Sequence, residues 1–404
     1  MKQVFRLLVG EGFRVFFLGA GVFGFLSMFV WITYQVVLNL GGNPDFPTAM
    51  SPHLWHGHEM IFGYGGAALG GFFLTAVPNW TGAKAAPHRF IAFVAGLWIA
   101  GRVVVWMSGV LPPVAVAVID LSFAPVLGAK IASQLLRKPK PQNMVFLLFL
   151  TFFWTANLLV HLEWMDVTKA TAGIGLRGGL MALVGMIIVL GGRVTPAFTR
   201  NAMHRAGIES GTPSDPKLFT PLAIGLAATL PLVAMLSDGT VVSGVVYLAA
   251  GIFTLVRVGV WHTRFQWSQP ILWSLHLSCA SVGAGLVLKG LAPFTSLSEV
   301  AGLHFIAISG VGGMTFAVMA RASLGHAGLA LVAARPVAFG FVALPLAGIV
   351  RWAGGTFGGE FYALSIWMSG GFWLVAFTGF LAVYVPIFTT PRAPRAPVGP
   401  PPSS

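Results

Sequence analysis

The chain has few charged residues and a single cysteine. Only 9% of its 404 residues are charged and 56% are hydrophobic, whereas globular proteins carry roughly 25% charged residues. This composition excludes an ordinary soluble enzyme. Because Cys279 is the only cysteine, an internal disulfide and the Cys-x-x-Cys-His haem-attachment motif are both excluded. The sequence also lacks a phosphate-binding glycine loop, a nucleophile elbow and a zinc-protease motif.

The charge that remains is strongly positive. The formal net charge is +13, from 24 Lys and Arg against 11 Asp and Glu. The basic residues lie in short clusters between apolar runs, as in multispan membrane proteins whose loops face anionic lipid and the cytoplasm. We therefore expect a lipid bilayer as the partner and no nucleic acid.

Apolar runs of about twenty residues, long enough to cross a bilayer, recur along the chain. They predict an all-α integral membrane protein with about twelve transmembrane helices in one polytopic domain, residues 1–389. The tail, 390–404, is rich in Pro, Arg and Ser, and we expect it to be disordered and cytoplasmic. We expect no cleavable signal peptide, because the short basic start is followed by a full-length span. The predicted spans fall near 14–38, 56–77, 90–108, 113–135, 143–162, 174–192, 218–236, 240–260, 270–289, 301–320, 336–352 and 362–386.

Lys and Arg concentrate on one side of this topology. By the positive-inside rule, that side and both termini are cytoplasmic. The opposite side carries few basic residues, namely Arg102, Lys169, Arg177, Lys289 and Arg351.

Spans two, six and ten are glycine-rich, run inward and leave the membrane through similar polar corners. The separation of about four spans between them predicts three four-helix units. The corners are Thr75–Thr81, Arg193–Asn201 and Met319–His326.

The entrance of span two carries two imidazoles and a carboxylate. A charge at bilayer depth costs roughly 2.5–3.5 kcal/mol on insertion scales, so such residues indicate a functional site. On a regular helix His56 and His58 point about 160° apart, so they serve either two sites or one site at a non-helical entrance. An interfacial pair bonded to loop carbonyls is the alternative. Glu59 is positioned to orient one imidazole.

His304 opens span ten at a similar depth, above a run of glycines. Such glycines admit either a flat macrocycle or a neighbouring helix. A bis-imidazole haem needs histidines from two helices at one level, which His304 with His56 or His58 would supply. His161 is a third candidate at this depth, or else a surface-level residue.

On the cytoplasmic side, His276 and Cys279 share a helix face, although such a cysteine is more often a small buried hydrophobe. His326 is a further candidate ligand. Arg193 and Arg321 are candidates for pairing with haem propionates, although arginines at cytoplasmic span ends are also common. Asp120, inside span four, is a candidate proton-path or pairing carboxylate.

Together these motifs make the sequence similar to the NnrS family of membrane proteins over nearly its whole length. The family usually has Ala at Gly57. The motifs that carry the resemblance are Trp55–Gly63, Leu74–Gly82, Gly191–Asn201, Leu272–Leu277, and Leu303–His304 through Ala322–His326.

The resemblance implies a bacterial inner-membrane protein that contains non-covalent haem b and copper and acts in nitric oxide metabolism or nitrosative stress during denitrification. A weaker likeness to the catalytic subunits of haem–copper oxidases and nitric oxide reductases rests on His56–Phe62 and on His304. Span six has no histidine for copper, which argues against transferring their mechanism.

We therefore predict a haem held by His56 or His58 with His304, and a second metal centre drawn from His58, His161, His276 and His326. Nitric oxide or a related small molecule would be the ligand, and a quinol or another donor would supply electrons to any oxidoreductase turnover. A twelve-span secondary transporter of a metal, a metal–nitrosyl species or a small ligand is the main alternative. A sensor or assembly partner without catalysis is a third.

Overall fold

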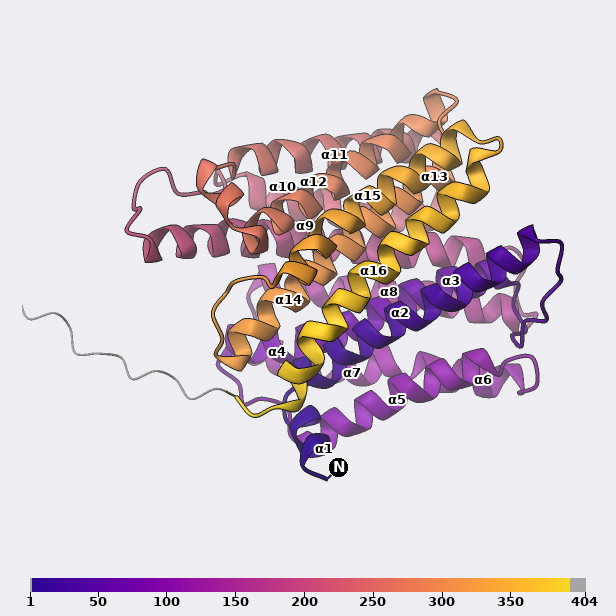
Figure 1. The fold of residues 1–404 in the computed structure, drawn as a ribbon, viewed down its shortest axis with the longest axis horizontal. Helices are drawn as coiled ribbons and strands as arrows, with labels where there is room; N and C mark the ends of the chain where they lie inside the picture. The colour runs from indigo at the N-terminus through magenta and orange to yellow at the C-terminus, as the bar shows by residue number, and fades with distance from the viewer. Residues whose placement is uncertain (1, 393–404) are drawn as a thin grey trace, which may run out of the picture.

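The fold is a bundle of long helices (Figure 1) in a computed structural model that describes residues 2–392. Twelve helices of this part are long and apolar enough to cross a bilayer, so the predicted twelve spans are confirmed. No strand occurs in the described residues. The part of the predicted tail that follows Arg392 lies outside the described residues. The helices are α1 (Lys2–Leu8), α2 (Gly12–Asn39), α3 (Pro52–His58), η1 (Glu59–Gly65), α4 (Gly66–Thr81), α5 (His88–Trp106), α6 (Pro113–Leu121), α7 (Phe123–Leu135), α8 (Pro141–Trp164), α9 (Ala172–Arg205), α10 (Phe219–Leu236), α11 (Val241–Val260), η2 (Arg264–Ser268), α12 (Pro270–Leu291), η3 (Ala292–Phe294), α13 (Glu299–Phe305), η4 (Ile306–Gly312), α14 (Gly313–Ala327), α15 (Arg335–Phe357) and α16 (Phe361–Thr389).

Apolar side chains cover the outside of the bundle. Helices satisfy every backbone hydrogen bond internally, as a bilayer requires, and the peripheral spans then turn large apolar groups outward. A surface of this kind fits lipid rather than water. Exposed examples on five different spans are Phe29, Phe93, Val118, Ile252 and Phe339.

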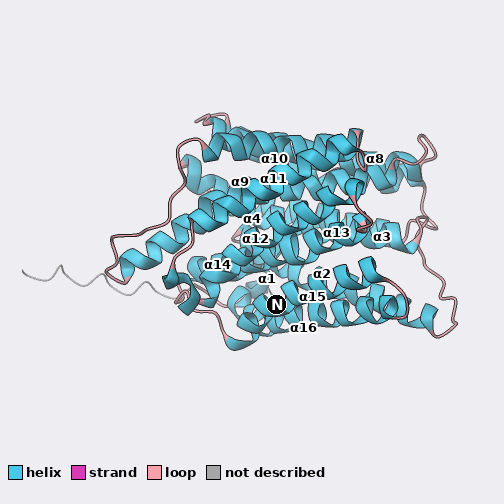
Figure 2. Cartoon of the chain, turned by 90° about the horizontal axis from the view of Figure 1, so that it is seen from above, coloured by secondary structure: helices cyan, strands magenta, loops and turns pink. Residues whose placement is uncertain are grey.

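Spans two, six and ten meet in the middle of the bundle (Figure 2), where α9 contacts the π-helices of the other two. An apolar cavity of about 50 Å³ lies between the three spans. Three methionines line it, Met186 from span six and Met314 and Met319 from span ten. The three glycine-rich spans therefore form the core around which the others pack.

Two of these three spans share a departure from the α-helix. Directly after His58, residues 59–65 form a π-helix, and residues 306–312 form another, two residues after His304. π-Helices are rare and are frequently found at functional sites. Span six stays α-helical throughout α9. The irregularity is thus confined to the spans whose entrances carry histidine.

The two ends of the bundle differ in chemistry. We call the end with His58 and His304 the histidine end. The opposite end, where α9 and α14 terminate at Arg205 and Ala327, is the arginine end. Gly82 and Gly328, both with positive φ, stop spans two and ten there, as glycine does at helix C-termini.

Candidate functional site

A buried ion-pair network lies at the histidine end. Arg102 of α5 bonds to both Glu59 of η1 and Asp120 of α6. All three side chains are nearly or completely inaccessible to solvent. Gly63 makes this possible, because a Cβ there would lie 2.9 Å from the Arg102 guanidinium. One arginine thus neutralises one of two buried carboxylates.

Two imidazoles complete this network. His58 places Nδ1 2.8 Å from Glu59 Oε1 and Nε2 2.9 Å from Asn157 Oδ1. The Asn157 amide is oriented by its Nδ2, which donates to Asp120. Both ring nitrogens of His58 therefore face acceptors, which favours the doubly protonated imidazolium. Its charge balances the second carboxylate, and His161 donates from Nε2 to Asp120 over 2.8 Å.

Within residues 2–392, three of these groups could share a metal ion. One ligand atom from each of His58, Asp120 and His161 lies within 4.8 Å of the others. Two imidazoles and a carboxylate are donors suited to a transition metal such as copper. Here the same nitrogens hold hydrogen bonds, so metal binding would displace the proton of His58. By the chemistry of its donors the triad fits a metal. Binding of the metal would replace some of the hydrogen bonds of the network.

His56 points away from this network, as the helical period predicts. Its ring stacks on Trp31, with centroids 4.5 Å apart and planes 8° apart. Its Nδ1 is buried and makes no hydrogen bond within the described chain. His304 and Arg351 lie close enough for their charges to act on it. Nitrogen-bearing side chains of spans two, ten and eleven therefore lie at this end, near enough for their charges to interact.

His304 is oriented like a metal-binding histidine. Its Nδ1 lies 2.8 Å from the Val300 carbonyl, which fixes the ring and leaves Nε2 for another partner, an arrangement typical of ligating imidazoles. Nearby, Arg351 has one buried terminal nitrogen without a hydrogen bond in residues 2–392. By their donor chemistry, His56 and His304 are residues of the kind that ligate haem iron, with Arg351 as a nearby cation.

The other two predicted histidines lie towards the arginine end. His276 places Nε2 3.0 Å from the Thr199 hydroxyl, and its Nδ1 is buried and unbonded within the described chain. His326 packs on Phe13, with ring centroids 5.3 Å apart. The structure does not bring either of them to His56 or His304.

The two predicted arginines also lie far from those histidines. Arg321 follows His304 by 17 residues of one span, roughly 25 Å at the helical rise, and stacks over Phe198. Arg193 donates to Asn143 Oδ1 over 2.9 Å and lies over Trp80. Neither arginine is placed to pair with a haem at the histidine end.

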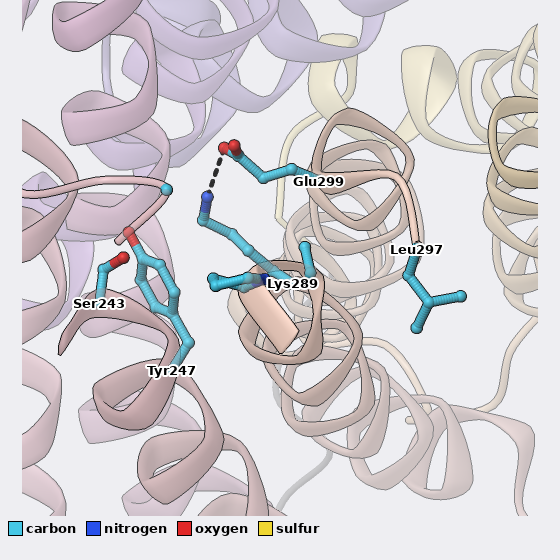
Figure 3. A pocket seen from close by; sticks show the side chains of 8 residues that line it. Ser243, Tyr247, Lys289, Leu297 and Glu299 are labelled. Atoms are coloured by element: carbon cyan, nitrogen blue, oxygen red, sulfur yellow. Dashed lines mark hydrogen bonds and ion pairs between the residues drawn. The ribbon is translucent and has the colours of Figure 1, made fainter. Parts of the chain in front are cut away.

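A second ion-pair network lies near His304 (Figure 3). Lys289, whose side chain is 1% exposed, places Nζ 2.9 Å from Asp238 and 2.7 Å from Glu299. Arg177 bonds to the same carboxylates at 3.0 and 3.2 Å. Tyr247 donates to Asp238 over 2.7 Å. The network lines a cavity of about 150 Å³ and secures Glu299, the first residue of α13.

The predicted site did not include Arg102, Lys289 or Glu299. The signal was in the sequence, because Arg102 and Lys289 interrupt apolar runs, and a charge within a span needs a partner. Their partners could not be identified, because Asp120 lies in another span and Asp238 in the turn between α10 and α11.

The family comparison covers almost the entire bundle. The family model described as NnrS protein matches residues 7–392. No curated protein matches the chain. The matched region includes all twelve spans and both ion-pair networks, and the chain therefore belongs to the NnrS family of membrane proteins linked to nitric oxide.

Proposed function

We propose that this protein is a haem-binding protein of the bacterial inner membrane that binds nitric oxide, with haem b held between His56 and His304. One observation carries the proposal. Histidines of spans two and ten lie at the same end of the bundle, His56 with a buried unbonded nitrogen and His304 with its ring fixed through Val300, and the charge of His304 acts on His56. A ligating histidine is typically held in this way.

The chain's own residues orient and charge-balance this site. Trp31 stacks on His56 and limits rotation of its ring. Arg351 supplies a cation for a propionate, the role that sequence alone gave to Arg193 and Arg321. The bound haem would supply an iron that binds nitric oxide and exchanges electrons. A quinol or another donor would provide those electrons, and the arginine end would face the cytoplasm together with both termini.

We assign copper to the triad of His58, Asp120 and His161 because its ligand atoms are already close. Arg102 and Glu59 would set the net charge of that site. His276 and His326 stay candidates for further metal.

The transporter alternative draws support from the twelve spans and the cavity between spans two, six and ten. Transporters bind substrate near the bilayer midplane, between broken helices. Here both π-helices lie in spans that line the cavity, but His56, His58, His161 and His304 lie at the histidine end and not at the cavity. The haem proposal accounts for those histidines, whereas transport does not require them.

Absorption spectroscopy of the purified full chain tests the proposal. The protein should show one stoichiometric Soret band that shifts when nitric oxide is added. His56→Ala and His304→Ala should each lose most of the haem, whereas His53→Ala, at an exposed position in the same segment, should keep it. A colourless protein that moves metal into vesicles would favour transport, and full haem in both variants would refute the ligand assignment.

A further inference from the structure

A polar cavity of about 170 Å³ lies at the arginine end, where α9, α12 and α14 meet. Liquid water occupies about 30 Å³ per molecule, so the cavity has room for a small oxyanion with a few waters. Figure 1 shows α9 and α14 ending on the same side of the bundle. Seven residues line the cavity, and none is acidic: Ala202, Arg205, Gln269, Ile271, Leu272, Arg321 and Leu331.

Two guanidinium groups give the cavity its charge. Arg205 and Arg321 both line it, and they lie close enough for their charges to repel. Neither forms an ion pair with an acidic residue in the described chain. Two like charges held together without a counter-charge raise the local affinity for an anion.

The Arg321 guanidinium is available to bind an anion. Its guanidinium lies 3.2 Å from the centroid of the Phe198 ring, and stacking leaves the in-plane N–H groups free to donate. Its Nε is buried and makes no hydrogen bond within residues 2–392.

The start of α12 adds a third favourable element. Gln269 is the residue before α12, and Ile271 lies in the first turn of its 22 residues. Pro270 has no N–H, and the Leu272 N–H donates to the Gln269 carbonyl. This turn therefore offers the Ile271 N–H and the positive end of the helix dipole, which together favour an anion. The Gln269 side chain contributes an amide to the same wall.

We propose that this cavity binds a small oxyanion with two or more terminal oxygens, held by Arg205, Arg321 and the first turn of α12. The ligand class includes nitrite, phosphate and carboxylates, because a guanidinium pairs with two oxygens at once. This site is separate from the histidine end and does not depend on haem binding. Arg321 therefore pairs with an anion from the solution or the lipid at the arginine end, and not with haem propionates.

Calorimetric titration of the full chain in phospholipid-free detergent tests this site. Sodium nitrite, phosphate and acetate are each titrated against chloride at constant ionic strength. We expect at least one to bind, with an affinity about tenfold or more weaker in Arg321→Gln and Arg205→Gln, since charge-assisted hydrogen bonds are lost. Arg321→Lys, which keeps the charge without the fork, should be intermediate. Arg137→Gln removes an exposed arginine away from the cavity and should bind like the wild type.

The source of the oxyanion is resolved by repeating the titration in phosphatidylglycerol nanodiscs. If the site takes a free anion, the wild type binds it equally well in nanodiscs. If the site takes a lipid headgroup phosphate, the phosphatidylglycerol occupies it, and the heat of anion binding disappears in the wild type. Native mass spectrometry of the wild type and Arg321→Gln then shows whether one bound phospholipid is lost. Two results overturn the proposal: no anion exceeds chloride in folded wild-type protein, or Arg321→Gln loses haem, which would return Arg321 to the cofactor.

Discussion

Two cations at the histidine end and two at the arginine end differ in their partners. At the histidine end, Arg102 and Lys289 are each bonded to two carboxylates. At the arginine end, Arg193 and Arg321 lie on aromatic rings and have no acidic partner in the described chain, whereas Arg14 and Arg257 of the same end pair with Glu11 and Asp215. The first arrangement fixes helices to each other, and the second leaves positive charge available.

This difference has an energetic consequence. Removing one member of a buried pair leaves an uncompensated charge and is strongly destabilising. Removing a cation that has no buried counter-charge leaves nothing unpaired. Substitutions of Arg102 or Lys289 should therefore lower the free energy of unfolding, whereas substitutions of Arg193 or Arg321 should instead affect binding.

Asp120→Ala should produce the largest effect, because Asp120 bonds to Arg102, Asn157 and His161 at once. We expect the free energy of unfolding to fall by about 3–5 kcal/mol, measured by denaturant titration in detergent. Asp45→Ala, an exposed aspartate in the loop after α2, should change it by less than about 0.5 kcal/mol. Equal effects of the two substitutions would show that the buried network contributes no more to stability than an exposed carboxylate does.

Lys289→Met should have a smaller effect of the same kind. Its partners Asp238 and Glu299 are 12% and 27% exposed, so water can partly replace the lost ammonium, and we expect a loss of about 1–3 kcal/mol. Lys169→Met, at an exposed position near the same end, is the matched control. If Lys289 also holds α13 in place, the double variant Lys289→Met with Glu299→Gln should be more stable than Lys289→Met alone. Strict additivity of the two substitutions would show that they do not act as a pair.

Arg321→Gln should lower the free energy of unfolding by only about 1 kcal/mol, the value of a lost cation–π contact with Phe198. The same measurement that is made for Asp120→Ala serves here. A loss as large as that of Asp120→Ala would mean that Arg321 has a structural partner and that the arginine end is not an open cationic surface.

The sequence predicted the architecture well because bilayer thickness and backbone hydrogen bonding permit few alternatives. All twelve spans are present, and the fourth, at 113–135, has the predicted bounds. Span six continues to Arg205, well beyond the predicted 192. Its polar last turns are helical because a helix can extend past the membrane, which hydropathy does not report.

Individual contacts in the site were less predictable. The helical period correctly separated His56 from His58, since that divergence is local. The π-helix after His58 depends on packing against other spans, so no local pattern reveals it. The alternative partners of Arg193, namely Trp80 and Asn143, also come from other spans. What the sequence lacks is the arrangement of the spans, not the chemistry of their residues.

Gly57→Ala should have the smallest effect and tests whether the histidine end is rigid everywhere or only at its ion pairs. Gly57 lies between His56 and His58 in α3, and an added Cβ would meet only the tip of the Leu176 side chain, at 3.0 Å. Replacing a helical glycine by alanine gains roughly 0.5–1 kcal/mol, and a small shift of Leu176 offsets part of it.

Gly312→Ala is the contrasting variant, because its Cβ would lie 2.6 Å from the Trp373 ring, which a hydrogen bond to the Gly24 carbonyl holds in place. We expect thermal unfolding to give an unchanged or slightly higher midpoint for Gly57→Ala and a clearly lower one for Gly312→Ala. A large loss of stability in Gly57→Ala would show that α3 cannot move at all, and the rigidity now attributed to ion pairs would then belong to the packing of the whole end.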